Sequence, residues 1–199
     1  DKFIFASTGG AIYGEQDYFP ASEDHPQKPT SPYGLSKLSV EGYLKFYKEQ
    51  YGLKSIIFRY GNVFGPRQNP NGEAGVIAIF YNRLLKGHAP IINGDGEQTR
   101  DYIFVRDVVH ANLLALNLDG SDTFNVGTGQ ETSVNELTHL ILEVAESDIE
   151  VQTSKKNNFE QRRSCLDYKK LKDSLNWSPK VSLKEGLSET FIFFKKNGI

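Results

Sequence analysis

Several features that are common in proteins are scarce in this chain of 199 residues, and each scarcity excludes a class of protein. The single cysteine, Cys165, excludes an internal disulfide and fits a reducing compartment such as the cytoplasm. No apolar run approaches the roughly 20 residues that a membrane-spanning helix needs, and we find no signal peptide. The net charge of −2 offers no general attraction to nucleic acid or to an anionic membrane. We therefore expect a cytoplasmic protein that binds neither.

Histidine and methionine are also scarce. The histidines lie far apart and none has the spacing of a metal site, so we assign no metal ligand among His25, His88, His110 and His139. Methionine is absent altogether, and the chain opens directly on an apolar segment. We therefore expect a piece of a longer protein. What remains, with 38% apolar and 24% charged residues, is the composition of a globular domain.

The spacing of apolar residues predicts alternating strands and helices. Aromatic and β-branched runs predict strands at 2–7, 54–60, 101–105 and 122–126, with shorter ones at 89–93 and 150–154. Helical spacing predicts helices at 34–51, 76–86, 107–118, 133–146, 167–175 and 183–196. We expect Asp107 to cap the third helix, and Ser133 with Glu136 to form a capping box on the fourth. The Gly-rich segments 8–16 and 61–75 predict loops. Strand, helix and strand within 60 residues predict a parallel βαβ unit.

The segment "SPYGLSK" contains Tyr33 and Lys37, four residues apart on a predicted helix. Residues at this spacing share one helix face, so the lysine ammonium can stabilise the phenolate and lower the pKa of the tyrosine towards working pH. A second pair, Tyr168 and Lys172, shows that the spacing alone has little weight. Only the first pair follows a strand that ends in a hydroxyl, at Thr8, where parallel sheets bind ligands. We therefore favour Tyr33 as a general base and interpret the second pair as a solvated helix face.

Six stretches extend this reading over nearly the whole chain: "FASTGGAIYGE", "SPYGLSK", "FRYGNVFGPRQ", "GEAGVIAIF", "NGDGEQTRDYIFVRDV" and "FNVGTGQ". In this order they resemble the extended short-chain dehydrogenases/reductases, within the NAD-dependent epimerase/dehydratase family, and most of all the UDP-glucose 4-epimerases. The resemblance implies the C-terminal part of a Rossmann-type parallel sheet, with a smaller α/β region that binds substrate. We expect the first part at 1–65 and the second at 66–199, with Rossmann elements returning around 101–127.

The resemblance also implies roles for individual residues. The catalytic hydroxyl, base and lysine would be Thr8, Tyr33 and Lys37. NAD would contact Tyr33, Lys37, Tyr60 and Val63. The nucleotide sugar would contact Thr8, Asn62, Val76, Ile77, Asn93, Arg100, Asn125 and Glu160. A homodimer is implied for the full-length enzyme.

These side chains fit one chemical sequence. Tyr33, as a phenolate, would take the proton of the sugar 4-hydroxyl while a hydride passes from C4 to NAD⁺. Thr8 would hydrogen-bond the same oxygen, and Lys37 would hold the nicotinamide ribose. Rotation of the 4-keto sugar and return of the hydride to its other face would invert C4. Arg100 offers a planar fork to a diphosphate oxygen, although a salt bridge with Asp101 is an alternative.

The residues after Thr8 separate the possible reactions. Dehydratases and decarboxylases that resemble this chain have an acidic residue directly after the hydroxyl. Gly9 and Gly10 occupy that place here and have no side chain to protonate a leaving hydroxyl. This favours oxidation and re-reduction at C4, hence epimerisation.

Two motifs of the resembled enzymes are missing. No G-x-x-G-x-x-G occurs, although in such enzymes it places the NAD phosphates on a helix N-terminus. An Arg-x-Gly-Asp/Glu pattern is also expected ahead of "SCLD", where this chain has Asn157, Phe159 and Glu160. Another cationic side chain would then contact the second phosphate, and the candidates are Lys155, Lys156 and Arg163. A dehydratase or reductase, and a non-catalytic fragment without the cofactor half, remain as alternatives.

Overall fold

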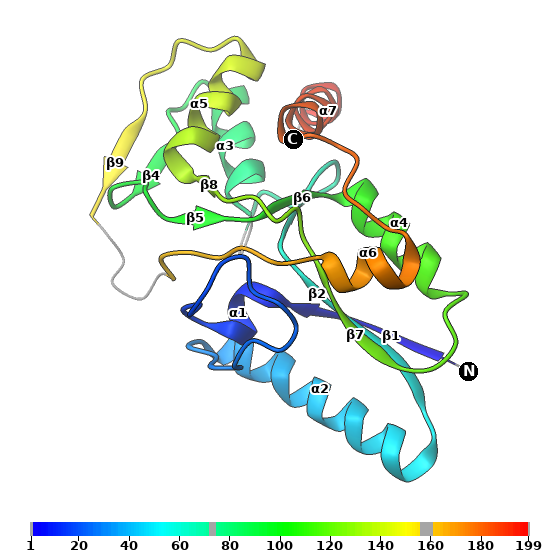
Figure 1. Ribbon diagram of the computed structural model, residues 1–199. Helices are drawn as coiled ribbons and strands as arrows, with labels where there is room; N and C mark the ends of the chain where they lie inside the picture. Colours follow the sequence, from blue (N-terminus) through cyan, green and yellow to red (C-terminus); the bar gives the residue numbers. More distant parts are fainter. Residues whose placement is uncertain (1, 72–74, 156–160, 199) are drawn as a thin grey trace.

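The computed structural model describes residues 2–71, 75–155 and 161–198 and centres on a parallel three-stranded sheet (Figure 1). Its strands are β1 (Lys2–Thr8), β2 (Lys54–Tyr60) and β7 (Asp122–Val126), in the order β1-β2-β7. Thr8 pairs with Tyr60, and Tyr60 with Val126, so the three strands end together. The predicted parallel βαβ unit and the α/β class are confirmed.

Helices cover both faces of this sheet. The long helix α2 (Pro32–Tyr51) lies below it in Figure 1, and α4 (Val105–Ala115) and α6 (Lys169–Leu175) lie on the other side. Strand side chains alternate between the two faces. Phe58 and Phe124 pack with α4, α6 and Trp177 in one apolar core, whereas Arg59 and Ser7 face α2. This alternation gives one apolar face and one face with buried polar groups.

Local chemistry sets the ends of α2. The Ser31 hydroxyl accepts a hydrogen bond from the Gly34 amide at 3.1 Å, and Pro32 occupies the first helical position, where no amide donor is needed. Gly52 ends the helix with a left-handed φ of 69°, which glycine adopts at little cost. These signals place Tyr33 in the first turn, directly beside the sheet.

A second core lies in the upper part of Figure 1, among α3 (Val76–Leu85), α5 (Val134–Ala145) and α7 (Leu183–Asn197). Small two-stranded ladders join it to the sheet: β3 (Asn62–Phe64) with β6 (Tyr102–Phe104), β4 (Ile91–Asn93) with β9 (Gln152–Ser154), and β5 (Thr99–Arg100) with β8 (Thr132–Ser133). The predicted capping box of Ser133 and Glu136 is confirmed at the start of α5.

Three local predictions are wrong. The segment predicted as a loop at 8–16 contains the short helix α1 (Gly9–Tyr13), because Thr8 caps it. The predicted loop 61–75 contains β3. Asp107 is not a cap: α4 begins at Val105 and ends at Ala115, and the buried Asp107 carboxylate accepts the amides of Lys180 and Val181, both at 3.1 Å.

The division predicted at residue 65 stays a prediction. The core around the β1-β2-β7 sheet also includes Leu171 and Trp177, which lie outside the range 101–127 expected to return to it. Within the described ranges, no helix has both the length and the apolar character needed to cross a membrane. The same residues contain no group of three or more His, Cys, Asp or Glu side chains arranged to hold a metal ion.

Candidate active site

The carboxyl end of β1 presents the first candidate group. Thr8 is the last residue of that strand and the N-cap of α1, where its side-chain oxygen accepts from the Ala11 amide at 3.5 Å. Parallel strands place their ligands at this end of the sheet. The hydroxyl therefore stands at the expected edge and keeps its proton available for donation.

The first turns of α2 bring the second and third groups to the same strand. The Lys37 ammonium donates to the Ala6 carbonyl oxygen at 2.9 Å and lies 5.7 Å from the centroid of the Tyr33 ring. Tyr33 is 53% exposed. The lysine is therefore bonded to β1 and lies near the ring of Tyr33, in the first turn of α2.

The second tyrosine–lysine pair has a different setting. Tyr168 is the N-cap of α6 and packs edge-on against the buried Trp177 ring, with centroids 5.7 Å apart. Its ring contributes to the core of the sheet, and its hydroxyl has no strand-end partner of the Thr8 kind. The arrangement agrees with a structural role for Tyr168.

A pocket of about 480 Å³ lies beside α3 and the short ladders, and four of the residues predicted to contact the nucleotide sugar line it: Asn62, Val76, Asn93 and Arg100. The rest of the lining comes from α3 and the short ladders, including Arg83, Gln98 and Tyr102. Arg83 was missed by the sequence reasoning. Helical spacing could have indicated this residue, because Arg83 follows Val76 by seven residues on α3 and therefore lies on the same helix face.

Two arginine side chains, Arg83 and Arg100, line this pocket. Asp101, the alternative partner considered for Arg100, is fully buried, and its carboxylate accepts from the amides of Thr128, Gly129 and Leu166. Arg83 and Arg100 therefore bring two guanidinium groups, which are good donors to anions, to this pocket.

Other predicted residues lie elsewhere. Ile77 is buried in the second core behind the pocket. Val63 lines a very small cavity beside it. The Tyr60 hydroxyl accepts from the Asn112 amide at 2.8 Å, on the α4 side of the sheet, and burial raises the pKa of that phenol. Glu160 lies outside the described residues.

Asn125 is a core residue rather than a wall of the pocket. It is fully buried, and its side-chain oxygen accepts from the Tyr13 hydroxyl at 2.7 Å. Its amide donates to the carbonyl oxygens of Ala21 and Asp167 at 2.9 and 3.2 Å. The side chain therefore uses its bonding capacity to join α1 to β7.

The two glycines after Thr8 are packed differently. A Cβ atom on Gly9 would lie 2.5 Å from a methyl carbon of Leu166, closer than carbon atoms approach. A Cβ on Gly10 would lie 3.0 Å from the Ser164 hydroxyl oxygen. An acidic side chain at residue 9 therefore requires Leu166 to move.

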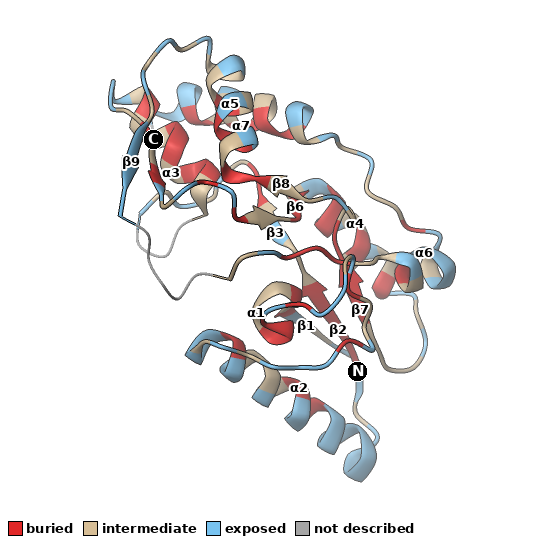
Figure 2. Ribbon diagram, turned by 60° about the vertical axis from the view of Figure 1, so that its left-hand side comes forward, coloured by how far each residue is buried: buried red, intermediate tan, exposed pale blue. Residues whose placement is uncertain are grey.

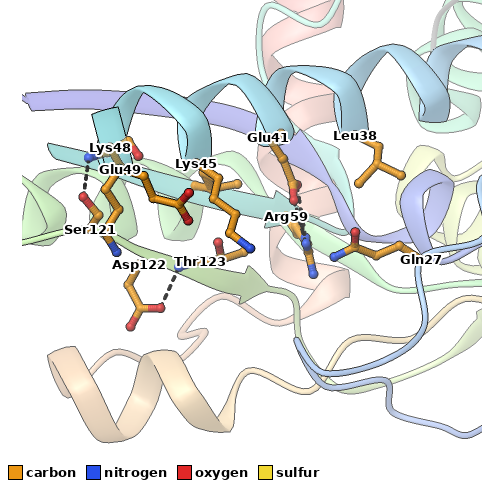
Figure 3. Close-up of a pocket in the computed structure, with 13 residues that line it drawn as sticks. Gln27, Leu38, Glu41, Lys45, Lys48, Glu49, Arg59, Ser121, Asp122 and Thr123 are labelled. Carbon is orange, nitrogen blue, oxygen red and sulfur yellow. Dashed lines mark hydrogen bonds and ion pairs between the residues drawn. The ribbon is translucent and has the colours of Figure 1, made fainter. Parts of the chain in front are cut away.

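A larger depression of about 630 Å³ lies between α2 and the strands β2 and β7 (Figure 3). Its lining mixes cations with anions, such as Lys45, Lys48, Glu49 and Asp122. Thr8, Tyr33 and Lys37 are not part of it. The candidate catalytic groups therefore lie outside this depression, towards the carboxyl end of β1.

Known proteins are similar to this chain in sequence and in fold. The crystal structure of UDP-glucose 4-epimerase from Thermotoga maritima with UDP-glucose matches with a TM-score of 0.96 and 51% identity, covering 100% of this chain and 64% of that one. The Thermus thermophilus UDP-glucose 4-epimerase in complex with NAD matches at 0.92 and 43%, covering 98% and 64%. A dTDP-D-glucose 4,6-dehydratase of Homo sapiens is 35% identical in an alignment that covers 99% of this chain and 57% of the human protein.

The chain thus spans less than two thirds of the length of each of these proteins. The family model described as GDP-mannose 4,6 dehydratase matches residues 1–190. The strand-end hydroxyl, the helix pair and the arginine-lined pocket agree with this match. The chain belongs to the GDP-mannose 4,6 dehydratase family of NAD-dependent nucleotide-sugar epimerases and dehydratases, within the short-chain dehydrogenase/reductase superfamily.

Proposed function

We propose that the full-length protein catalyses NAD-dependent 4-epimerisation of a nucleotide sugar, specifically a UDP-hexose of the UDP-glucose/UDP-galactose kind. The observation that carries the proposal is that Thr8 ends β1, while Lys37 bonds to Ala6, two residues before it, and lies near the Tyr33 ring. A hydroxyl, a phenol and an ammonium at a sheet's ligand-binding edge can move a proton to and from a sugar oxygen.

The chain's own residues account for the proton transfers. Tyr33 removes the proton of the 4-hydroxyl, and its phenolate is favoured by the nearby ammonium and the helix N-terminus. Thr8 donates a hydrogen bond to the same oxygen. Lys37 is anchored by Ala6 at 2.9 Å and can offer its remaining protons to a ribose hydroxyl. When bound, NAD⁺ would supply the acceptor for the C4 hydride and, as NADH, the donor that returns it to the other face of the keto carbon. Tyr33 returns the proton after the keto sugar has turned.

The pocket of about 480 Å³ suits the diphosphate part of the substrate. We propose that Arg100 and Arg83 bind it together, since both line the pocket and a guanidinium group can give two parallel hydrogen bonds to phosphate oxygens. The Arg83 Nε donates to the Ala89 carbonyl at 2.6 Å, which fixes the base of its guanidinium. Arg163, one of the cations considered earlier, instead forms two bonds with Glu131 at 2.9 and 2.5 Å and does not line the pocket.

A dehydratase is the second candidate, because several relatives carry that activity in their names. Gly9 supports epimerisation against it, since glycine has no side chain that could protonate a leaving hydroxyl, and an acidic side chain there would require Leu166 to move. The deciding experiment incubates the full-length protein and NAD⁺ with UDP-glucose, UDP-galactose and a dTDP-hexose. Interconversion at C4 without loss of water supports the proposal, and a 4-keto-6-deoxy product contradicts it.

Two further properties are proposed. A homodimer is favoured by the outer face of α2, where exposed large apolar side chains follow one another, namely Leu35, Tyr43, Phe46, Tyr47 and Tyr51. Figure 2 shows this face of α2 as largely exposed. Sedimentation of the full-length protein and of its Tyr43→Lys variant tests the dimer.

A cytoplasmic location is proposed on the single Cys165, which is a buried, free thiol.

A further inference from the structure

A buried ion pair joins α2 to the sheet two turns beyond Tyr33. The Glu41 carboxylate accepts two bonds from Arg59 of β2, at 2.6 Å from Nη2 and 3.1 Å from Nε. The Ser7 hydroxyl donates to the same carboxylate at 2.6 Å. Exposure is only 7% for Glu41 and 3% for each of its partners. Figure 3 shows Glu41 projecting from the helix onto Arg59.

The position of this carboxylate relates it to the catalytic groups. Tyr33, Lys37 and Glu41 follow at four-residue intervals along α2, and Lys37 and Glu41 are turned to the sheet. Lys37 contacts Ala6 and Glu41 contacts Ser7, the two residues that precede Thr8. Each of two successive turns of the catalytic helix is thus attached to the strand that ends in the catalytic hydroxyl.

The partners of Arg59 extend the connection. Its Nη1 donates to the Tyr13 hydroxyl at 3.1 Å, at the end of the helix that Thr8 caps. Burial raises the pKa of Tyr13 to about 12, so this phenol keeps its proton, which it donates to Asn125. The ion pair therefore fixes both elements that meet at Thr8.

Stability alone gives no reason for such a pair. Burying two charges costs about as much free energy as their attraction returns, and well-packed apolar residues often replace such pairs without loss. The cost is explained if the pair contributes geometry, because a displacement of about 1 Å at a catalytic group can cost about 100-fold in rate. Pairing also neutralises the Glu41 carboxylate, which would otherwise oppose the effect of Lys37 on the Tyr33 phenol.

We propose that Glu41 and Arg59 are positioning residues, which hold the Tyr33–Lys37 face of α2 against the Thr8 strand end and keep its charge balanced. The inference rests on the proposed function and deepens it. The carboxylate lies eight residues from Tyr33, which is about 12 Å along a helix. At that distance an unpaired charge shifts a pKa by about 0.2 to 1 unit, depending on the local dielectric.

The test uses two single variants whose charge effects have opposite signs. Glu41→Gln leaves the Arg59 cation unpaired and should lower the pKa of the Tyr33 phenol, whereas Arg59→Met leaves an unpaired carboxylate and should raise it. Ultraviolet difference titration of tyrosinate in the full-length protein with NAD⁺, with Tyr33→Phe as the blank, measures this without turnover. Shifts of one sign in both variants, or no shift in either, overturn the charge-balancing role.

Turnover tests the geometric role. In the double variant Glu41→Leu with Arg59→Met, the charges are replaced by apolar groups, so thermal unfolding should be little changed. We expect kcat to fall about 10- to 100-fold with little change in KM for the nucleotide sugar. Glu49→Gln, on the exposed part of the same helix, is the matched control and should leave kcat unchanged. A stable double variant with normal kcat overturns the geometric role. If the unmodified protein turns over no nucleotide sugar, the proposed function fails, while the titration still decides on Glu41.

Discussion

The Lys37 ammonium nitrogen lies 2.9 Å from the Ala6 carbonyl oxygen, two residues before the strand-end hydroxyl of Thr8. This bond attaches the first turns of α2 to β1 and leaves the lysine beside the Tyr33 ring. One side chain thereby joins the two elements on which the proposed chemistry depends.

Removing the Tyr33 hydroxyl tests the proposed base. Tyr33→Phe keeps the ring and should keep the fold, because this side chain is more than half exposed. We expect kcat to fall by about 10²- to 10⁴-fold, the usual range for general acid–base catalysis. The measurement is steady-state epimerisation by the full-length protein. Tyr168→Phe is the matched control, and a similar loss in both variants contradicts the assignment.

The sequence predicted the parts of this site that depend on local patterns. β7 was predicted at its observed ends because five alternating and β-branched residues stand between turn residues. Tyr33 and Lys37 were placed on one helix face by spacing alone. The long-range bonds that bury Asn125 between α1 and β7 could not be predicted, because a local motif does not reveal them, and its contact with substrate stays a prediction. Asp107 failed as a cap for the same reason, since its amide partners lie more than 70 residues away.

The two arginines of the pocket should act on substrate binding. Arg100→Ala is expected to raise KM for a UDP-sugar with little effect on NAD affinity, because the pocket includes none of Thr8, Tyr33 and Lys37. Arg83→Ala should have the same direction, and should weaken UDP more than UMP if both guanidinium groups hold the diphosphate. Calorimetry with UDP, UMP and NAD⁺ separates these effects. If the variants lose affinity only for NAD⁺, the pocket binds the cofactor and not the nucleotide sugar.

Gly9 provides a test of reaction type. Gly9→Asp introduces the acid that a dehydratase would use, but its Cβ would lie 2.5 Å from Leu166. We expect a destabilised protein with no dehydratase product, since the side chain and Leu166 compete for one space. Product analysis and thermal unfolding check both parts. Pairing it with Leu166→Ala makes room, and a well-folded Gly9→Asp single variant that eliminates water would refute the packing argument.

The Cys165 thiol should be inert in the folded protein. Burial is the main cause that raises its pKa, to about 12, so the thiol stays protonated where an unfolded cysteine, with a pKa near 8.5, would ionise. The unfolded chain therefore loses its proton first as pH rises, and this group should lower stability above about pH 8.5. We expect slow labelling by a thiol reagent at pH 8 that becomes fast in denaturant. Cys165→Ala should remove the part of the loss of stability at alkaline pH that this thiol causes. Rapid labelling of the native protein would contradict the buried position.

The last prediction concerns NAD binding by the polypeptide of residues 1–199. Its sequence contains no G-x-x-G-x-x-G, the motif that brings dinucleotide phosphates to a helix N-terminus. In the part of the sheet that the structure describes, β1 pairs with β2 alone, so one strand edge beside Thr8 has no strand neighbour. Phe3 on this strand is exposed, and an open edge of this kind promotes association. We therefore expect this polypeptide to bind NAD⁺ weakly and to self-associate, as measured by calorimetric titration and a sizing column. The full-length protein is the control. Equal NAD⁺ affinity in the two proteins, with residues 1–199 running as a monomer, would show that the groups at the Thr8 edge bind the cofactor without a glycine-rich turn.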